Sequence, residues 1–263
     1  MLVAGIDIGA ATTKAVIWGD GEILGYSIIP TGYDVKLAAN KVIKEALMKG
    51  APSASIRNFN YIVSTGYARG SISFANRTVT EVICHAKGAH FVIPSTRFII
   101  DIGGQDSKAI EIDPEGKVTN FVMNDKCAAG TGRFLDVMAQ VLEVGSVDKM
   151  GPLGLQSKEP CTISSTCTVF AETEVVVLRA EGKDRKDLIA GVHKAVSLRV
   201  AAMALSLTCR PDAVFTGGVA KNSGVKKYLE EEIGMKFLVP DEPQIIGALG
   251  AALIAQEEFL KQH

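Results

Sequence analysis

Two nine-residue segments of the sequence carry residue types suited to binding a polyphosphate. The segment IDIGAATTK at 6–14 recurs as IDIGGQDSK at 100–108, with five of nine positions identical. Glycine lets backbone N–H groups approach an anion closely, and hydroxyl and lysine side chains donate to phosphate oxygens. Asp7 and Asp101 close the apolar run before each turn, where a carboxylate can bind a cation through water. The repeat therefore predicts two similar turns that hold a polyphosphate from both sides.

A third segment supports this interpretation of the first phosphate turn (residues 9–14) and the second phosphate turn (residues 103–108). VFTGGVAKN at 214–222 is an apolar strand that ends in two glycines at an expected helix start, where a base and ribose can lie flat on the backbone. The helix N-terminus favours negative charge nearby. An ordinary hairpin explains one Asp-x-Gly turn, but it explains two aligned copies and the Gly217 turn (residues 217–222) poorly. No Walker pattern and no G-x-G-x-x-G after a strand occurs.

Strands and helices are expected to position these turns. The apolar patterns and turn residues predict strands at 2–8, 14–18, 22–29, 61–66, 97–102, 108–113, 117–123, 212–216 and 236–239. They predict helices at 34–49, 79–92, 132–144, 169–180, 186–208, 223–232 and 245–260. A repeated strand–turn–strand device suggests two similar lobes. We expect an α/β fold with a first lobe at 1–95 plus 245–263 and a second lobe at 96–244.

Composition restricts the classes of function. The chain has 263 residues, of which 47% are hydrophobic, and a formal net charge of −1. With no dense basic run, nucleic-acid binding has no compositional support. No apolar run reaches transmembrane length and no charged leader precedes the first strand, so we expect a cytoplasmic protein without a membrane partner. An odd number of cysteines, five, argues against a disulfide framework.

The cysteines form a second candidate for chemistry. Cys127, in NDKCAAGTGRF, and Cys167, in ISSTCTVFAE, each stand before an expected helix, whose dipole favours the thiolate that iron–sulfur clusters and zinc require. Free cysteines are more often buried small hydrophobes. That interpretation suits Cys84 and Cys209, which lie in helix-like apolar patterns, and Cys161 is also expected to be structural. Composition alone leaves Cys127 and Cys167 open, because the chain has no C-x-x-C spacing.

The three turns, in this order, resemble the phosphate-1, phosphate-2 and adenosine motifs of the actin, Hsp70 and sugar-kinase ATPase superfamily. That resemblance spans almost the whole chain. It implies two ribonuclease H-like lobes with ATP or ADP in the cleft between them. It does not by itself decide the function, because the superfamily includes kinases, chaperones and filament proteins.

Longer strings resemble one branch of that superfamily. NDKCAAGTGRFL and SSTCTVFAETEV, with TGYAR at 65–69, CHAKGA at 84–89 and DIGGQD at 101–106, are similar to the activators (component A) of 2-hydroxyacyl-CoA dehydratases, in the benzoyl-CoA reductase/dehydratase-activator family. The resemblance implies an ATPase that couples hydrolysis to low-potential transfer of one electron. The electron passes from a ferredoxin or flavodoxin to a 2-hydroxyacyl-CoA dehydratase or a related double-cubane iron–sulfur protein.

The resemblance also implies the cofactors and the residues that hold them. Cys127 and Cys167 are expected to bind one [4Fe–4S] cluster shared by two identical subunits, because such a cluster takes four thiolates and each chain supplies two. Asp7 and Asp101 are expected to hold Mg²⁺ through water, and Gln105 to orient the attacking water; these three are the expected catalytic residues. The expected nucleotide-binding residues are Gly9, Ala10, Ala11, Thr12, Thr13, Lys14, Gly103, Gly104, Gln105, Gly217, Gly218, Val219 and Asn222.

A small-molecule kinase acting on a sugar or amino sugar is the alternative function. Asp101 and Asp106 offer the carboxylate base that a kinase needs, but a kinase gives no reason for two cysteines that open helices. Brown anaerobic protein with about two irons per chain, as a shared cluster requires, would separate the two functions. His85 is expected to be packed or capping, and Glu172 either faces the cleft or serves the first turn of its helix. The acyl-CoA substrate of the partner is not encoded in these motifs.

Overall fold

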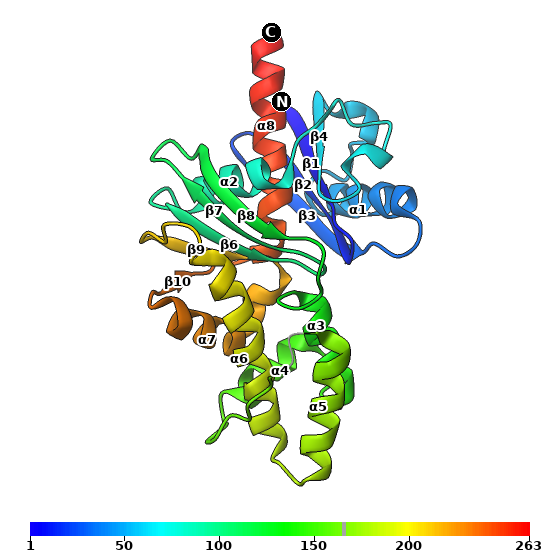
Figure 1. The fold of residues 1–263 in the computed structure, drawn as a ribbon. Helices are drawn as coiled ribbons and strands as arrows, with labels where there is room; N and C mark the ends of the chain where they lie inside the picture. The colour runs from blue at the N-terminus through cyan, green and yellow to red at the C-terminus, as the bar shows by residue number, and fades with distance from the viewer. Residues whose placement is uncertain (165–166) are drawn as a thin grey trace. The chain divides into compact units, whose positions relative to one another are not determined.

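The computed structural model describes residues 1–164 and 167–263, and in it the chain forms two compact units (Figure 1). Unit 1 comprises Met1–Thr96, Ile112–Thr119 and Pro240–His263, and unit 2 comprises Arg97–Glu111 and Asn120–Val239. The assignment of functional lobes to 1–95 plus 245–263 and to 96–244 stays a prediction. Among the described residues, no helix is long and apolar enough to cross a membrane.

Unit 1 is built on a five-stranded mixed sheet. Its strands are β1 (Leu2–Ile8), β2 (Thr12–Gly19), β3 (Glu22–Pro30), β4 (Tyr61–Thr65) and β5 (Arg77–Thr78), in the order β3-β2-β1-β4-β5. β1 pairs with β2 antiparallel and with β4 parallel, so β1 lies at the centre. The hairpin from β1 to β2 is the first phosphate turn, as the sequence predicts.

Helices cover both faces of this sheet because the side chains of β1 alternate between them. Ala4 and Ile6 pack with α1 (Val35–Gly50), whereas Val3 packs with α8 (Ile246–Gln262). Asp34 caps α1 by accepting hydrogen bonds from two backbone N–H groups of its first turn. α2 (Glu81–Val92) lies against α8. The turn that follows β1 is therefore held on a strand that is buried on both faces.

Unit 2 repeats the sheet topology. Its strands are β6 (Phe98–Ile102), β7 (Ser107–Ile112), β8 (Val118–Asn124), β9 (Ala213–Thr216) and β10 (Phe237–Leu238), in the order β10-β9-β6-β7-β8. Again the central strand pairs antiparallel with the next strand and parallel with the fourth. The predicted α/β class with two similar ribonuclease H-like sheets is confirmed. The tip of the β7–β8 hairpin, Ile112–Thr119, is grouped with unit 1.

An insertion distinguishes the second repeat from the first. Residues 31–60 separate β3 from β4 in unit 1, whereas residues 125–212 separate the corresponding strands β8 and β9 in unit 2. The longer segment holds both candidate ligand cysteines and four helices among its described residues: α3 (Gly132–Val141), α4 (Val147–Gly154), α5 (Thr168–Ala180) and α6 (Arg185–Ala204). With α7 (Ser223–Ile233), they form one hydrophobic core against a face of the sheet.

Two expected helix ends were wrong, and one helix was missed. The helix expected at 132–144 ends at Val141, because Glu143 and Gly145 adopt positive φ. The helix expected at 186–208 ends at Ala204, where hydroxyl groups of the following turn bond to backbone carbonyls, as Ser206 Oγ does to the Met203 carbonyl. Cys209 consequently lies outside any helix. α4 was not expected, because its eight residues include a proline and two glycines.

Close packing of α2 on α8 yields a stability prediction. A Cβ at Gly250 would lie 1.8 Å from the Cys84 carbonyl oxygen, which is backbone and cannot move aside. We expect Gly250→Ala to lower the free energy of unfolding by about 3 kcal/mol, as overpacking does. Gly70→Ala is the control, because a Cβ there meets nothing within 4 Å. Urea unfolding measures both, and equal midpoints for the two variants would contradict the packing.

Candidate functional site

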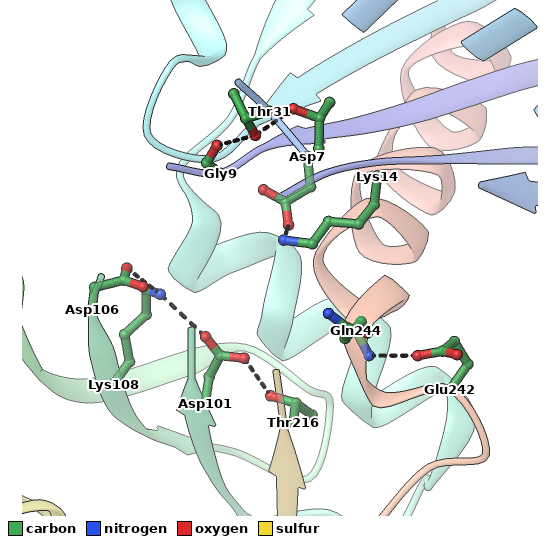
Figure 2. A network of polar contacts seen from close by, with 11 residues as sticks. Asp7, Gly9, Lys14, Thr31, Asp101, Asp106, Lys108, Thr216, Glu242 and Gln244 are labelled. Atoms are coloured by element: carbon green, nitrogen blue, oxygen red, sulfur yellow. Dashed lines mark hydrogen bonds and ion pairs between the residues drawn. The ribbon is translucent and has the colours of Figure 1, made fainter. Parts of the chain in front are cut away.

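In unit 1, the first phosphate turn surrounds a buried carboxylate. Asp7 lies one residue before the end of β1 with only 5% of its surface exposed, and Lys14 Nζ lies 3.1 Å from its Oδ2. Figure 2 shows this pair beside a second contact, in which Thr31 Oγ1 donates to the Gly9 carbonyl oxygen at 2.7 Å. Thr31 also bonds the Thr13 hydroxyl at 2.8 Å. The Thr13 hydroxyl is thus part of the turn's internal support, and no sequence pattern had indicated a role for Thr31.

In unit 2, side chains contact both oxygens of the carboxylate beside the second phosphate turn. Asp101 lies one residue before the end of β6 and is buried, with Lys108 Nζ 3.2 Å from Oδ2 and Thr216 Oγ1 donating to Oδ1 at 2.9 Å. Lys108, itself 1% exposed, also lies 2.6 Å from Asp106 Oδ2 (Figure 2). Gln105, at the tip of the turn, is exposed. The buried Lys108 ammonium lies between two carboxylates and compensates their negative charge.

A pair of equivalent threonines lies beside the two aspartates, and one of them, Thr216, donates a hydrogen bond to Asp101. Thr65 is the parallel-strand register partner of Asp7, and Thr216 is the partner of Asp101. Each threonine precedes a glycine at positive φ, Gly66 at +90° and Gly217 at +86°. A Cβ at either glycine would meet the aspartate Oδ1, at 2.4 Å and 2.9 Å. Thr-Gly at 65–66, within the TGYAR motif, and Thr-Gly at 216–217 were both noted in the sequence, but their equivalent places beside the two aspartates were not.

The Gly217 turn leads through a short 3-10 helix (Gly218–Lys221) into α7. Asn222 is the N-cap of α7: its Oδ1 accepts from the Gly224 and Val225 N–H groups, and its Nδ2 donates to the Val147 carbonyl. The side chain is fully buried. Asn222 therefore fixes the end of the turn, and its contact with adenosine stays a prediction. Val219 is also buried, whereas Gly218 is half-buried.

The two candidate ligand cysteines occupy different local structures. Cys167 is the N-cap of α5 and is exposed, as expected for a thiol that opens a helix. Cys127 is half-buried in a turn, four residues before the N-cap Thr131 of α3, so its expected place at the helix start was wrong. Residues 165–166, part of the second cysteine motif, lie outside the described residues. Among the described residues, no three His, Cys, Asp or Glu side chains gather as a metal site.

The surroundings of the other three cysteines favour an un-ionised thiol. Cys84 is fully buried in α2, and burial raises the pKa of its thiol to about 12. Burial also raises the pKa of Cys161 and that of Cys209. Cys209 Sγ lies 3.6 Å from the Ala204 carbonyl, to which it donates. A thiol that resists ionisation is a poor metal ligand, so these surroundings agree with the structural roles expected for them.

His85 is packed, as expected. It lies on α2 with 6% of its surface exposed. A Cβ at Gly247, in the first turn of α8, would lie 2.9 Å from its Nε2 and 3.3 Å from Asp7 Oδ2. The absence of that Cβ lets α8 approach the buried end of β1.

Comparison with known proteins identifies the family. A sequence model of the BadF/BadG/BcrA/BcrD ATPase family matches residues 4–255. The chain is 43% identical over 259 residues to the 2-hydroxyisocaproyl-CoA dehydratase activator of Clostridioides difficile, covering 98% of this chain and 96% of that protein. It is 44% identical over 263 residues to the activator of lactoyl-CoA dehydratase of Anaerotignum propionicum, covering 100% of both. The chain belongs to the BadF/BadG/BcrA/BcrD ATPase family.

Solved structures agree with this placement. The activator of the 2-hydroxyisocaproyl-CoA dehydratase from Clostridium difficile, with bound ADPNP, superimposes with a TM-score of 0.94 at 42% identity and covers 100% of this chain and 97% of that one. The resemblance to dehydratase activators is thus confirmed. A glucokinase of the ROK family from Streptomyces griseus reaches a TM-score of 0.57 at 14% identity, which shows the fold alone. The kinase alternative has only such distant structural relatives.

A buried histidine beside the Gly217 turn yields a pH prediction. His193 of α6 is fully buried, its Nε2 lies 3.2 Å from Asn222 Nδ2, and burial lowers its pKa from 6.5 to about 4. Burial disfavours the protonated form of His193 in the folded state. The neutral histidine therefore contributes its full share to the unfolding free energy above pH 6.5, and this contribution is lost as the pH falls toward 4. Between pH 7.5 and pH 4.5, we expect the unfolding free energy of His193→Gln to fall by about 2 kcal/mol less than that of the unmodified chain.

Urea unfolding at the two pH values measures this difference. His263→Gln is the control, because the side chain of His263 is exposed at the C-terminus. If His193→Gln retains the full pH dependence of the unmodified chain, the histidine is not the group responsible.

Proposed function

We propose that the chain is an ATP-driven electron-transfer activator, which passes one electron at low potential to a 2-hydroxyacyl-CoA dehydratase or a related double-cubane iron–sulfur protein. The observation that carries the proposal is the placement of Cys127 and Cys167 in the insertion that distinguishes unit 2 from the otherwise equivalent unit 1. The relatives named as dehydratase activators support it. The proposed electron donor is a ferredoxin or flavodoxin, and the proposed location is the cytoplasm.

ATP or ADP with Mg²⁺ is the proposed nucleotide. The relative solved with ADPNP supports this assignment. Asp7 and Asp101, at the ends of the central strands β1 and β6, would hold Mg²⁺ through water, and the exposed Gln105 would orient the attacking water. Lys14 would donate to phosphate. The remaining proposed nucleotide contacts are Gly9, Ala10, Ala11, Thr12, Thr13, Gly103, Gly104, Gly217, Gly218, Val219 and Asn222.

The residues present fit an iron–sulfur cluster. Cys167 is an exposed thiol at the start of a helix, where the dipole favours a thiolate, and Cys127 is held in a turn of small residues. When bound, the cluster supplies one-electron redox chemistry. The chain's contribution is to present two soft ligands and to place the N-terminus of α5 beside one of them, Cys167.

A homodimer completes the ligand set in this proposal. A [4Fe–4S] cluster takes four thiolates, and a twofold contact between two copies brings Cys127 and Cys167 together with their symmetry mates. α5, which Cys167 opens, supports this with a strip of exposed apolar side chains at helical spacing: Val169, Phe170, Val176 and Val177. A second copy seated there would bury both the strip and the cluster.

Replacement of the ligand cysteines tests the cluster. Cys127→Ser and Cys167→Ser should each lose the cluster, because a hydroxyl oxygen is a poor substitute for a soft thiolate. Cys84→Ser and Cys209→Ser should keep it. Iron analysis of protein purified without oxygen measures the outcome, with about two irons per chain expected for a shared cluster. Full iron content in Cys167→Ser would refute the ligand assignment.

The same preparations test the sharing of the cluster. Iron removal by a chelator should loosen the dimer, because metal binding stabilises only the assembled state. Light scattering of the protein before and after chelation measures this. A monomer with about four irons per chain would contradict the shared cluster.

Replacement of Asp101 tests the ATPase. Asp101→Asn keeps an acceptor for Thr216 Oγ1 but removes the charge proposed to hold Mg²⁺. We expect nucleotide to bind while turnover falls at least about tenfold. Asp113→Asn is the matched control, since the Asp113 side chain only accepts N–H groups in the hairpin tip and an amide oxygen does the same. Unchanged ATP turnover in Asp101→Asn would rule out the proposed role.

A further inference from the structure

The turn that carries Cys127 is held by side-chain hydrogen bonds from the residue before it and from its last residue. In this Cys127 turn (residues 125–131), Asn124 Nδ2 donates to the Cys127 carbonyl at 2.8 Å and to the Ala129 carbonyl at 3.0 Å. At the other end, Thr131 Oγ1 donates to the Ala128 carbonyl at 2.7 Å, and the Thr131 side chain is fully buried. The backbone of Cys127 is therefore fixed to Asn124, the last residue of β8.

The end of the Cys127 turn is bonded directly to the second phosphate turn. The backbone N–H of Gly132 donates to the Gly103 carbonyl at 2.8 Å, and that of Arg133 donates to the Gly104 carbonyl at 2.8 Å. The first N–H groups of a helix normally need a side-chain cap or water, and Thr131 provides no such cap to α3. The carbonyls of the phosphate turn take that role, so α3 begins where the phosphate turn places it.

The contact is close enough that residue size matters. A Cβ at Gly132 would lie 3.0 Å from the Gly103 carbonyl oxygen, 3.3 Å from Gly104 Cα and 3.4 Å from a methyl group of Val219. Gly132 thus touches both the second phosphate turn and the Gly217 turn. A side chain at position 132 would therefore press on both turns, and glycine avoids this contact.

A cavity beside Asn124 gives the Cys127 turn room to move. The cavity of about 370 Å³ is lined by Ser107, Met123, Asn124, Arg199, Ala202 and Met203. It extends from the strand that follows the second phosphate turn to the residue that anchors Cys127. Close-packed protein interiors transmit displacement but resist local change, so an adjacent cavity permits the turn to shift without repacking the core.

Cys167 is anchored elsewhere. Its preceding segment is tied to α5 by Ser164, whose N–H and hydroxyl donate to Glu174, and to α6 by the Cys161 N–H, which donates to the Asp187 carbonyl. Among the described residues, the hydrogen bonds of this segment lead to α5 and α6 and not to the second phosphate turn. The two proposed ligands of one cluster therefore have unequal connections to the nucleotide site.

We propose that the second phosphate turn, the first turn of α3 and the Cys127 turn form one relay, through which phosphate occupancy changes the position of Cys127 and leaves Cys167 in place. Asn124 is the positioning residue at the far end of this relay. The inference rests on the proposed function and names how its nucleotide site regulates its redox site. All its contacts lie within unit 2, so the relay does not require closure of one lobe on the other.

Thiol reactivity tests the relay. The full chain, reduced and free of iron, is alkylated with iodoacetamide with and without a non-hydrolysable ATP analogue and Mg²⁺, and the rate at each cysteine is followed by peptide mass spectrometry. Calorimetry on the same samples records nucleotide binding. We expect the nucleotide to change the Cys127 rate at least about fivefold, a coupling typical between sites, with a smaller change at Cys167.

Two variants locate the coupling. Gly132→Ala should bind nucleotide but lose the response at Cys127, because its methyl group separates α3 from the second phosphate turn. Asn124→Ala should raise the Cys127 rate without nucleotide and weaken the response. Asn120→Ala is the matched control, since Asn120 is exposed on the same strand and bonds only the adjacent Phe121 N–H.

The outcomes separate the relay from the proposed function. Nucleotide binding with an unchanged Cys127 rate, or with equal changes at Cys127 and Cys167, would overturn the relay and leave the ATPase assignment standing. A retained response in both Gly132→Ala and Asn124→Ala would also overturn it. Failure of the unmodified chain to bind nucleotide in the calorimeter would instead remove the proposed function, and the relay with it.

Discussion

Burial of a carboxylate at the end of each central strand is the constraint on which the rest of the structure depends. An ionised group out of water is costly unless charge and hydrogen bonds compensate it. Asp101 meets this need with Lys108 at one oxygen and Thr216 at the other, and Asp7 lies beside Lys14. These partners come from neighbouring strands, so the compensation requires the correct sheet register. The hairpin, its lysine and the next parallel strand must therefore fold together.

The repeated sheet provides this arrangement twice, and the glycines that follow β4 and β9 make it possible. Gly66 and Gly217 both adopt positive φ and lie against an aspartate oxygen, where any Cβ would collide. Divergence between the repeats is concentrated between the third and fourth strands of each sheet. The long segment in unit 2 adds α3, α4 and α5 without disturbing the strands. Under the proposed function, a common nucleotide-binding framework thus carries a specialised redox segment in one of its two repeats.

In the proposed activator, the insertion does more than hold the two cysteines. α3 starts on the carbonyls of Gly103 and Gly104, so the redox segment is built onto the phosphate site by backbone hydrogen bonds. Backbone bonds of this kind depend on conformation and little on side-chain identity, apart from the need for Gly132. Such a connection can transmit the state of a nucleotide over a short path inside one unit. The two cysteines are also connected differently to this site, since Cys167 is the N-cap of α5.

The sequence by itself determined the α/β class, the two similar strand–turn–strand devices and the residues at their turns, because these depend on local apolar periodicity and on glycine and aspartate at fixed positions. It also indicated the family through long motifs around Cys127 and Cys167. Only the tertiary structure decided that Thr216 supports Asp101, that Asn222 caps α7, and that Cys209 lies outside a helix. Those outcomes depend on register and on contacts between segments far apart in the chain, which local patterns do not encode.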